Sequence, residues 1–198
     1  NNCTWPFRPK DQEDYQSAIN MYENISTTWN AFMKYGPIDT WRLGKYRVPN
    51  AEIQTAVDEW LKGGDNKKNI EKKYGYISRW DVSNVTDMSE LFKDTEFNLD
   101  ISQWDVSSVT NMRGMFQGAK KFDRYIGKWD VSKVTDMSYM FESANLFNNG
   151  SQDSPTKQIL DWNVSNVKNM NYMFAEAKSF NGNIFAWNTS RVTDMGKM

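Results

Sequence analysis

A column of oxygen-bearing side chains recurs along the C-terminal two-thirds of this 198-residue chain, each directly after a tryptophan. Its members are Asp81, Asp105, Asp130, Asn163 and Asn188. On stacked strands these side chains would lie about 4.8 Å apart, where like charges repel unless a cation, a hydrogen bond or water intervenes. One interpretation is a Ca²⁺ site, because Ca²⁺ takes oxygen ligands. We favour the other, in which each side chain accepts hydrogen bonds from the serines two positions later.

The remaining chemistry of the sequence argues against catalysis. The chain has no histidine, the commonest general base, and its one cysteine is Cys3. No nucleophile accompanies the carboxylates, and no glycine-rich phosphate loop or Cys/His metal spacing is present. With 24 basic and 25 acidic residues, the chain lacks the basic excess of a nucleic-acid binder, and no apolar run could cross a bilayer. We therefore expect a protein that is not an enzyme, has no cofactor and binds no nucleic acid.

The tryptophans that precede this column define an internal repeat. They are 24, 25, 33 and 25 residues apart, and the long spacing coincides with a polar insertion at residues 148–155 that we expect to form a surface loop. Isoleucine lies three residues before each tryptophan, valine five after it and methionine eight after it. The methionines are Met88, Met112, Met137, Met170 and Met195. About five units of 24–25 residues therefore stack into one structure.

Each unit is predicted to contain two elements. The pattern Ile-x-x-Trp-x-Val indicates a strand, and Val-x-x-Met-x-x-Met-Phe places apolar residues on one face of a short helix or 3₁₀ segment. Thr86, Thr110, Thr135 and Thr193 occupy the expected N-cap positions. The tryptophans and methionines are expected to point inward as core, because one unit cannot bury its apolar face alone.

Residues ahead of the repeats divide into two segments. Residues 1–48 contain an extended arm and a predicted amphipathic helix over 11–35. Residues 49–76 contain a predicted helix over 51–61, which would cover the first repeat, and a charged, solvated turn from Lys67 to Lys73. Residues 77–198 form the repeats, and we expect the last unit to be incomplete at Met198.

The repeat pattern from Ile101 to Phe116 resembles the BspA-like leucine-rich repeats, also described as bacterial and mycoplasma surface-protein repeats. The lead-in from Glu52 to Trp60 is similar to that family's, and the resemblance covers about residues 49–198. It implies an α/β fold: a right-handed leucine-rich-repeat-like solenoid, capped by the N-terminal helical segment. It also implies frequent cell-surface exposure, a role in adhesion or protein contact, and no catalytic residues.

We expect an extracellular or cell-surface solenoid that binds a protein partner by its strand face or rim loops. The candidate contacts are Arg79, Asp81, Gln103, Asp105, Lys128, Asp130, Asp161, Asn163 and Asn188. The rival is a structural subunit of a larger organellar or photosynthetic assembly, docked through its N-terminal segment. Carbohydrate binding stays open as a third class, because repeats can align polar groups against a polymer. Within the insertion, Asn149 is the residue expected to be glycosylated if the chain is secreted.

Overall fold

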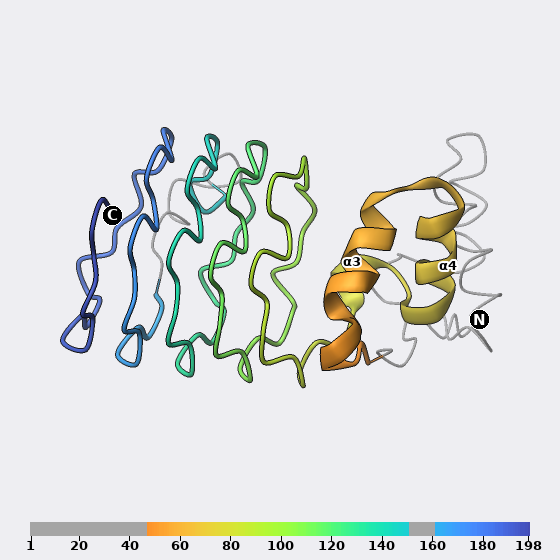
Figure 1. The fold of residues 1–198 in the computed structure, drawn as a ribbon, viewed down its shortest axis with the longest axis horizontal. Coiled ribbons are helices and arrows are strands. Elements are labelled where there is room, and N and C mark those ends of the chain that lie inside the picture. Colours follow the sequence, from red (N-terminus) through yellow and green to blue (C-terminus); the bar gives the residue numbers. More distant parts are fainter. Residues whose placement is uncertain (1–46, 151–160) are drawn as a thin grey trace, which may run out of the picture.

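The computed structural model describes residues 47–150 and 161–198 (Figure 1). A 3₁₀ turn, η2 (Asn50–Glu52), leads into helix α3 (Ile53–Leu61); helix α4 (Gly64–Tyr74) and a second 3₁₀ turn, η3 (Ile77–Arg79), follow. Helix α3 confirms the helix predicted over residues 51–61. The helix predicted over residues 11–35 and the extended arm lie outside the described residues.

Helix α4 replaces the turn that we predicted from Lys67 to Lys73, so that prediction was wrong. Positive φ angles at Gly63 and Gly75 bound the helix, and an ion pair between Lys67 and Glu71 spans one helical turn at 3.6 Å. Although α4 is rich in charged residues, one of its faces is buried. On that face the Glu71 carboxylate accepts a hydrogen bond from the Trp60 indole of α3 at 3.1 Å. Oppositely charged residues at helical spacing can stabilise a helix, so a high charge content does not by itself indicate a solvated loop.

From residue 77 onward the chain runs as flattened coils that stack side by side away from α3 (Figure 1). We number their described parts by the repeat: coil 1 is 77–100, coil 2 is 101–125, coil 3 is 126–150, coil 4 is 161–183 and coil 5 is 184–198. Isolated parallel bridges join each coil to the next, at Asp87, Asn111, Asp136, Asn169 and Asp194 in turn. The repeat phase read from the sequence is therefore also the spatial register.

Backbone hydrogen bonds make the stack continuous. The N–H groups of Met88, Glu90, Phe92 and Asp94 in coil 1 donate to the carbonyls of Asn111, Arg113, Met115 and Gln117 in coil 2, at 2.7–2.9 Å. The same four bonds join coil 2 to coil 3 and coil 3 to coil 4. Alternate N–H groups thus point along the stack, as in a parallel β-ladder.

The elements inside each coil differ from the prediction. The segment predicted as a strand contains tight turns instead, closed in coil 2 by Trp104 N–H to the Ile101 carbonyl at 3.0 Å and Val109 N–H to the Val106 carbonyl at 2.9 Å. The segment predicted as a short helix or 3₁₀ segment carries the ladder, and i to i+3 bonds such as Lys93 N–H to Glu90 O at 3.1 Å account for its helix-like spacing. Consecutive turns and a helix repeat their apolar residues at nearly the same interval.

The threonines predicted as N-caps also have another role. Thr110 Oγ1 donates to the Thr86 carbonyl at 3.1 Å, Thr135 Oγ1 to the Thr110 carbonyl at 3.2 Å, and Thr193 Oγ1 to the Lys168 carbonyl at 3.0 Å. Their hydroxyls therefore join neighbouring coils rather than cap a helix.

Stacked aromatic rings fill the core. Phe92, Phe116, Phe141 and Phe174 form a ladder with ring centroids 5.5–5.6 Å apart and planes within 10° of parallel. The repeat tryptophans are buried from coil 1 to coil 4, which confirms that they point inward, and Met88, Met112, Met137 and Met170 are buried with them. Each of the indoles of Trp104, Trp129 and Trp162 donates to the carbonyl of the repeat isoleucine one coil earlier, at 2.8–3.2 Å.

Candidate interaction surface

The column of Asp and Asn side chains beside the tryptophans is built from identical small turns. The N–H of the serine two residues later donates to the Oδ1 of Asp81, Asp105 and Asp130 at 3.0–3.1 Å, and likewise to Asn163 and Asn188 at 3.2 and 3.1 Å. In Asp81 the Ser83 hydroxyl donates as well, at 2.6 Å. The hydrogen-bonded interpretation of this column is therefore confirmed, and each side chain holds its own turn.

This geometry leaves one polar atom of several side chains free for a partner. Within the described residues, Oδ2 of Asp105 accepts no hydrogen bond, and Nδ2 of Asn163 and Asn188 donates none. The turn fixes the orientation of each side chain in advance. A partner that bonds to the second atom would lose less side-chain entropy than with a freely rotating carboxylate.

The nine candidate contacts lie at the surface, although not equally. Gln103, Asp105, Lys128, Asp130, Asp161, Asn163 and Asn188 are exposed, whereas Arg79 and Asp81 are half-buried. Asp81 is half-buried because it contacts the residues that precede η2. Arg47 Nε lies 3.6 Å from its Oδ2, and the Val48 N–H donates to its carbonyl at 2.9 Å. We call the seven exposed positions the tryptophan-flanking columns.

The Ca²⁺ interpretation gains no support from the geometry. In residues 47–150 and 161–198, no three His, Cys, Asp or Glu side chains gather as they would around a metal ion. Hydrogen bonding to the serine N–H groups already offsets the repulsion between stacked carboxylates. Consistent with this, bonds from Ser132 lower the pKa of Asp130 below its ordinary value of 3.8.

Sequence reasoning missed a second column with the same chemistry. It lies at the inter-coil bridges, where the N–H two residues later donates to Oδ1 at 2.8–3.0 Å; its members are Asp87, Asn111, Asp136, Asn169 and Asp194. The signal was present in the sequence, since the position follows the threonine column and is always Asp or Asn. These residues turn the chain into the ladder and contribute to the backbone register.

A third polar column runs through the interior. Oδ1 of Asn98 accepts the Asp123 N–H at 3.0 Å, Oδ1 of Asp123 accepts the Asn148 N–H at 2.9 Å, and Oδ1 of Asn148 accepts the Asn181 N–H at 2.9 Å. Asp123 Oδ1 also accepts the Gly150 N–H at 2.8 Å. These side chains act as structural acceptors between coils and leave little surface for a ligand, because Asp123 and Asn148 are buried.

Asn149, the residue expected to be glycosylated, belongs to this interior. Its side chain is 0% exposed, and its Oδ1 accepts the Ile126 N–H at 2.9 Å. An enzyme that attaches a glycan needs access to the side-chain nitrogen, so the burial of Asn149 argues against a glycan at this position. Asn148, Asn149 and Gly150, the first three residues of the predicted surface loop, are buried; the rest of that predicted loop lies outside the described residues.

A separate column combines two half-buried aromatic rings with two exposed cations. Tyr139 and Tyr172 stack with centroids 5.1 Å apart, the Arg113 guanidinium lies 4.7 Å from the Tyr139 ring, and Lys197 Nζ lies 5.2 Å from the Tyr172 ring. A hydrogen bond with Tyr172 raises the pKa of Lys197. Each outer ring face is covered by a cation, so the column offers ring edges and charge rather than a stacking face for sugars or bases.

Repeated polar turns over a stacked aromatic core define the class: a repeat protein whose variable positions lie on the outside of its coils. The chain belongs to the family described as Mycoplasma protein of unknown function, DUF285, whose model matches residues 65–161 and 151–198. Neither the curated proteins nor the solved structures searched contain a match to this chain. Among the helices of the described part, none is both long and apolar enough to span a membrane.

Proposed function

We propose that this protein is a non-enzymatic solenoid of the BspA-like leucine-rich-repeat type, which binds a protein partner through its tryptophan-flanking columns at a cell surface or outside the cell. One observation carries the proposal. In coils 2, 3 and 4 the repeat tryptophan is buried in the stack, while the positions on both sides of it, such as Gln103 and Asp105 or Lys128 and Asp130, are exposed.

The chemistry of these positions suits protein recognition. The column that follows the tryptophans is held by its turns and repeats in every coil, whereas the column that precedes them varies from Gln103 to Lys128 to Asp161. A fixed scaffold with variable neighbours lets such a surface acquire specificity without altering the core. Because the turns already fix these polar groups, less side-chain entropy is lost when a partner binds.

A charge swap on coil 3 tests the proposal. The double variant Lys128→Glu with Asp130→Lys keeps the net charge, and its matched control is Glu176→Lys with Lys178→Glu, an exposed pair elsewhere on the chain. Affinity purification from the source cells with mass spectrometry should recover the same partner with the wild type and the control, and lose it with the coil 3 swap. Recovery of identical partners by all three proteins would refute the proposal.

A second candidate is favoured by a different observation. Phe185 in coil 5 is 89% exposed. A structural subunit of a larger organellar or photosynthetic assembly would bury this ring against a neighbour. Size-exclusion chromatography of the purified chain separates the candidates, because a free surface protein should be monodisperse and an assembly subunit should self-associate until Phe185→Ser removes the apolar contact.

A further inference from the structure

The ladder of backbone hydrogen bonds that joins the coils is incomplete at coil 1. In coils 2, 3 and 4 the four carbonyls that point back along the stack each accept an N–H from the coil before. The equivalent groups of coil 1 are the carbonyls of Asp87, Ser89, Leu91 and Lys93, and no described residue donates a hydrogen bond to any of them. Coil 1 therefore presents an open row of four backbone acceptors, spaced at alternate residues.

The segment that precedes coil 1 covers its other groups. Asn50 Oδ1 accepts the Thr86 N–H at 2.8 Å, and the Gly75 carbonyl accepts the Trp80 indole N–H at 2.9 Å. Trp60 of α3 packs edge-on against Phe97 with centroids 6.3 Å apart. The Thr86 N–H, the Trp80 indole and the Phe97 ring thus have partners in this segment, whereas the row of carbonyls is left open.

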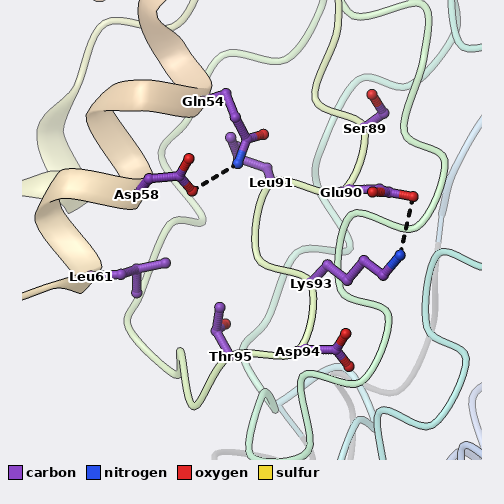
Figure 2. Close-up of a pocket in the computed structure, with 9 residues that line it drawn as sticks. All are labelled: Gln54, Asp58, Leu61, Ser89, Glu90, Leu91, Lys93, Asp94 and Thr95. Atoms are coloured by element: carbon purple, nitrogen blue, oxygen red, sulfur yellow. Dashed lines mark hydrogen bonds and ion pairs between the residues drawn. The ribbon is translucent and has the colours of Figure 1, made fainter.

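A pocket of about 420 Å³ lies along this row, between α3 and coil 1. Figure 2 shows its lining: Gln54, Asp58 and Leu61 come from α3, and Ser89, Glu90, Leu91, Lys93, Asp94 and Thr95 come from coil 1. The lining includes three carboxylates, on Asp58, Glu90 and Asp94, and one ammonium, on Lys93, which is already paired with Glu90 at 3.3 Å. The pocket therefore carries an excess of negative charge beside apolar Leu61 and Leu91.

We propose that this open row and its pocket bind an extended, lysine- or arginine-bearing peptide segment of a partner protein. The peptide would run along coil 1 as an added ladder strand, with alternate N–H groups donating to the four carbonyls. Its basic side chains would pair with Asp58, Glu90 and Asp94. This surface is separate from the tryptophan-flanking columns, so its test does not depend on the function proposed above.

The backbone of coil 1 also sets a sequence preference for the peptide. In every ladder the second and fourth donors have positive φ: Glu90 and Asp94 in coil 1, and Gly114 and Gly118 in coil 2. A peptide that reproduces this path needs residues that tolerate the left-handed region, four apart, and glycine does so at no steric cost. A peptide of alternating lysine and glycine meets both the charge and the backbone requirement.

The test uses the full chain and a fluorescein-labelled octapeptide of alternating lysine and glycine, with binding followed by anisotropy. Two control peptides accompany it: one with glutamate in place of lysine, and one with the same side chains but every amide nitrogen methylated. We expect the methylated peptide to bind at least about tenfold more weakly, because it has no N–H donors, and the glutamate peptide not to bind. Equal binding of the methylated peptide, or no binding of the first, would overturn the proposal.

Two variants locate the binding site. Asp58→Lys should weaken binding about fivefold or more by reversing a pocket charge, while Asp65→Lys, the same change on α4 outside the pocket, should leave it unaltered. Amide NMR shifts on binding should fall at residues 87–95. Shifts centred elsewhere, or contacts showing that residues 1–46 of the chain already fill the row, would also overturn the proposal.

Discussion

Asn50 accepts from Thr86 the same two hydrogen bonds that Thr86 accepts from Thr110. The Thr110 N–H and hydroxyl donate to the Thr86 carbonyl at 2.8 and 3.1 Å, and the Thr86 N–H and hydroxyl donate to Asn50 Oδ1 at 2.8 and 3.3 Å. A side-chain amide at the entrance to α3 thus replaces the backbone carbonyl of a preceding coil. At this position the segment before the repeats reproduces a contact that the coils make with each other.

Replacing Asn50 should therefore destabilise the start of the stack. Asn50→Ala removes the acceptor of the Thr86 N–H and is expected to lower the free energy of unfolding by about 1–2 kcal/mol. Asn50→Asp keeps an oxygen in place and should stay within about 0.5 kcal/mol of the wild type. Urea denaturation measures both, and equal stability of the alanine and aspartate variants would show that this contact does not contribute.

The phenylalanine ladder should be the most sensitive part of the core. Phe141 is fully buried and stacks on Phe116, Phe147 and Phe174, so Phe141→Ala is expected to cost roughly 3–5 kcal/mol through lost contacts and a cavity. Phe185→Ala removes the same atoms from an exposed site and should change stability by less than about 0.5 kcal/mol. Thermal and urea denaturation of both variants check this contrast, and similar losses would contradict it.

Two glycines with positive φ should respond differently to a methyl group. A Cβ on Gly150 would lie 2.9 Å from the Tyr125 backbone nitrogen, whereas a Cβ on Gly114 would meet only side-chain atoms, the nearest at 3.2 Å. Both variants incur the left-handed cost of about 1 kcal/mol. Gly150→Ala adds a backbone clash and should therefore lose clearly more stability than Gly114→Ala. Urea midpoints decide, and the reverse order would contradict the coil spacing described here.

The hydrogen bonds that hold the turn at Asp130 should be detectable in the pKa of Asp130. Hydrogen bonds from Ser132 lower the pKa of Asp130 below 3.8, so the carboxylate stabilises the folded chain above that pH and loses this contribution as the pH falls through the folded-state pKa. Ser132→Ala removes the hydroxyl and should raise the pKa of Asp130. Carboxyl ¹³C shifts recorded against pH measure it, with Asp105 in the same chain as an internal reference; an unchanged pKa would contradict a role for the hydroxyl.

Sequence patterns predicted the repeat phase, the inward tryptophans and methionines, and α3, because each depends on which side chains avoid water. They failed where backbone conformation decided the outcome. Glu90, Tyr139 and Tyr172 have positive φ, and nothing in their residue types announces it. Such residues are accommodated where the inter-coil hydrogen bonds fix the chain, and those bonds exist only after the coils have stacked.

The candidate surface shows the same division. Asp105 and Asp130 were identified from their constant position beside tryptophan, and their role in the turn followed from the serine two residues later. The burial of Asn149 was not predictable from its polar neighbours, because its oxygen is needed by Ile126 of the same coil, 23 residues earlier. The open carbonyl row was not predictable from the sequence either, because every residue has a backbone carbonyl and its type does not indicate whether that carbonyl is bonded.

Photo-cross-linking in the source cells tests the central claim, that the tryptophan-flanking columns bind a protein partner, most directly. A photoreactive amino acid would replace Gln103 or Lys128 in those columns, or Arg113 in the tyrosine-stacked column as a matched exposed control. We predict that positions 103 and 128 cross-link to the same protein and that position 113 does not. Equal cross-linking from all three positions, or none from 103 and 128, would contradict the claim.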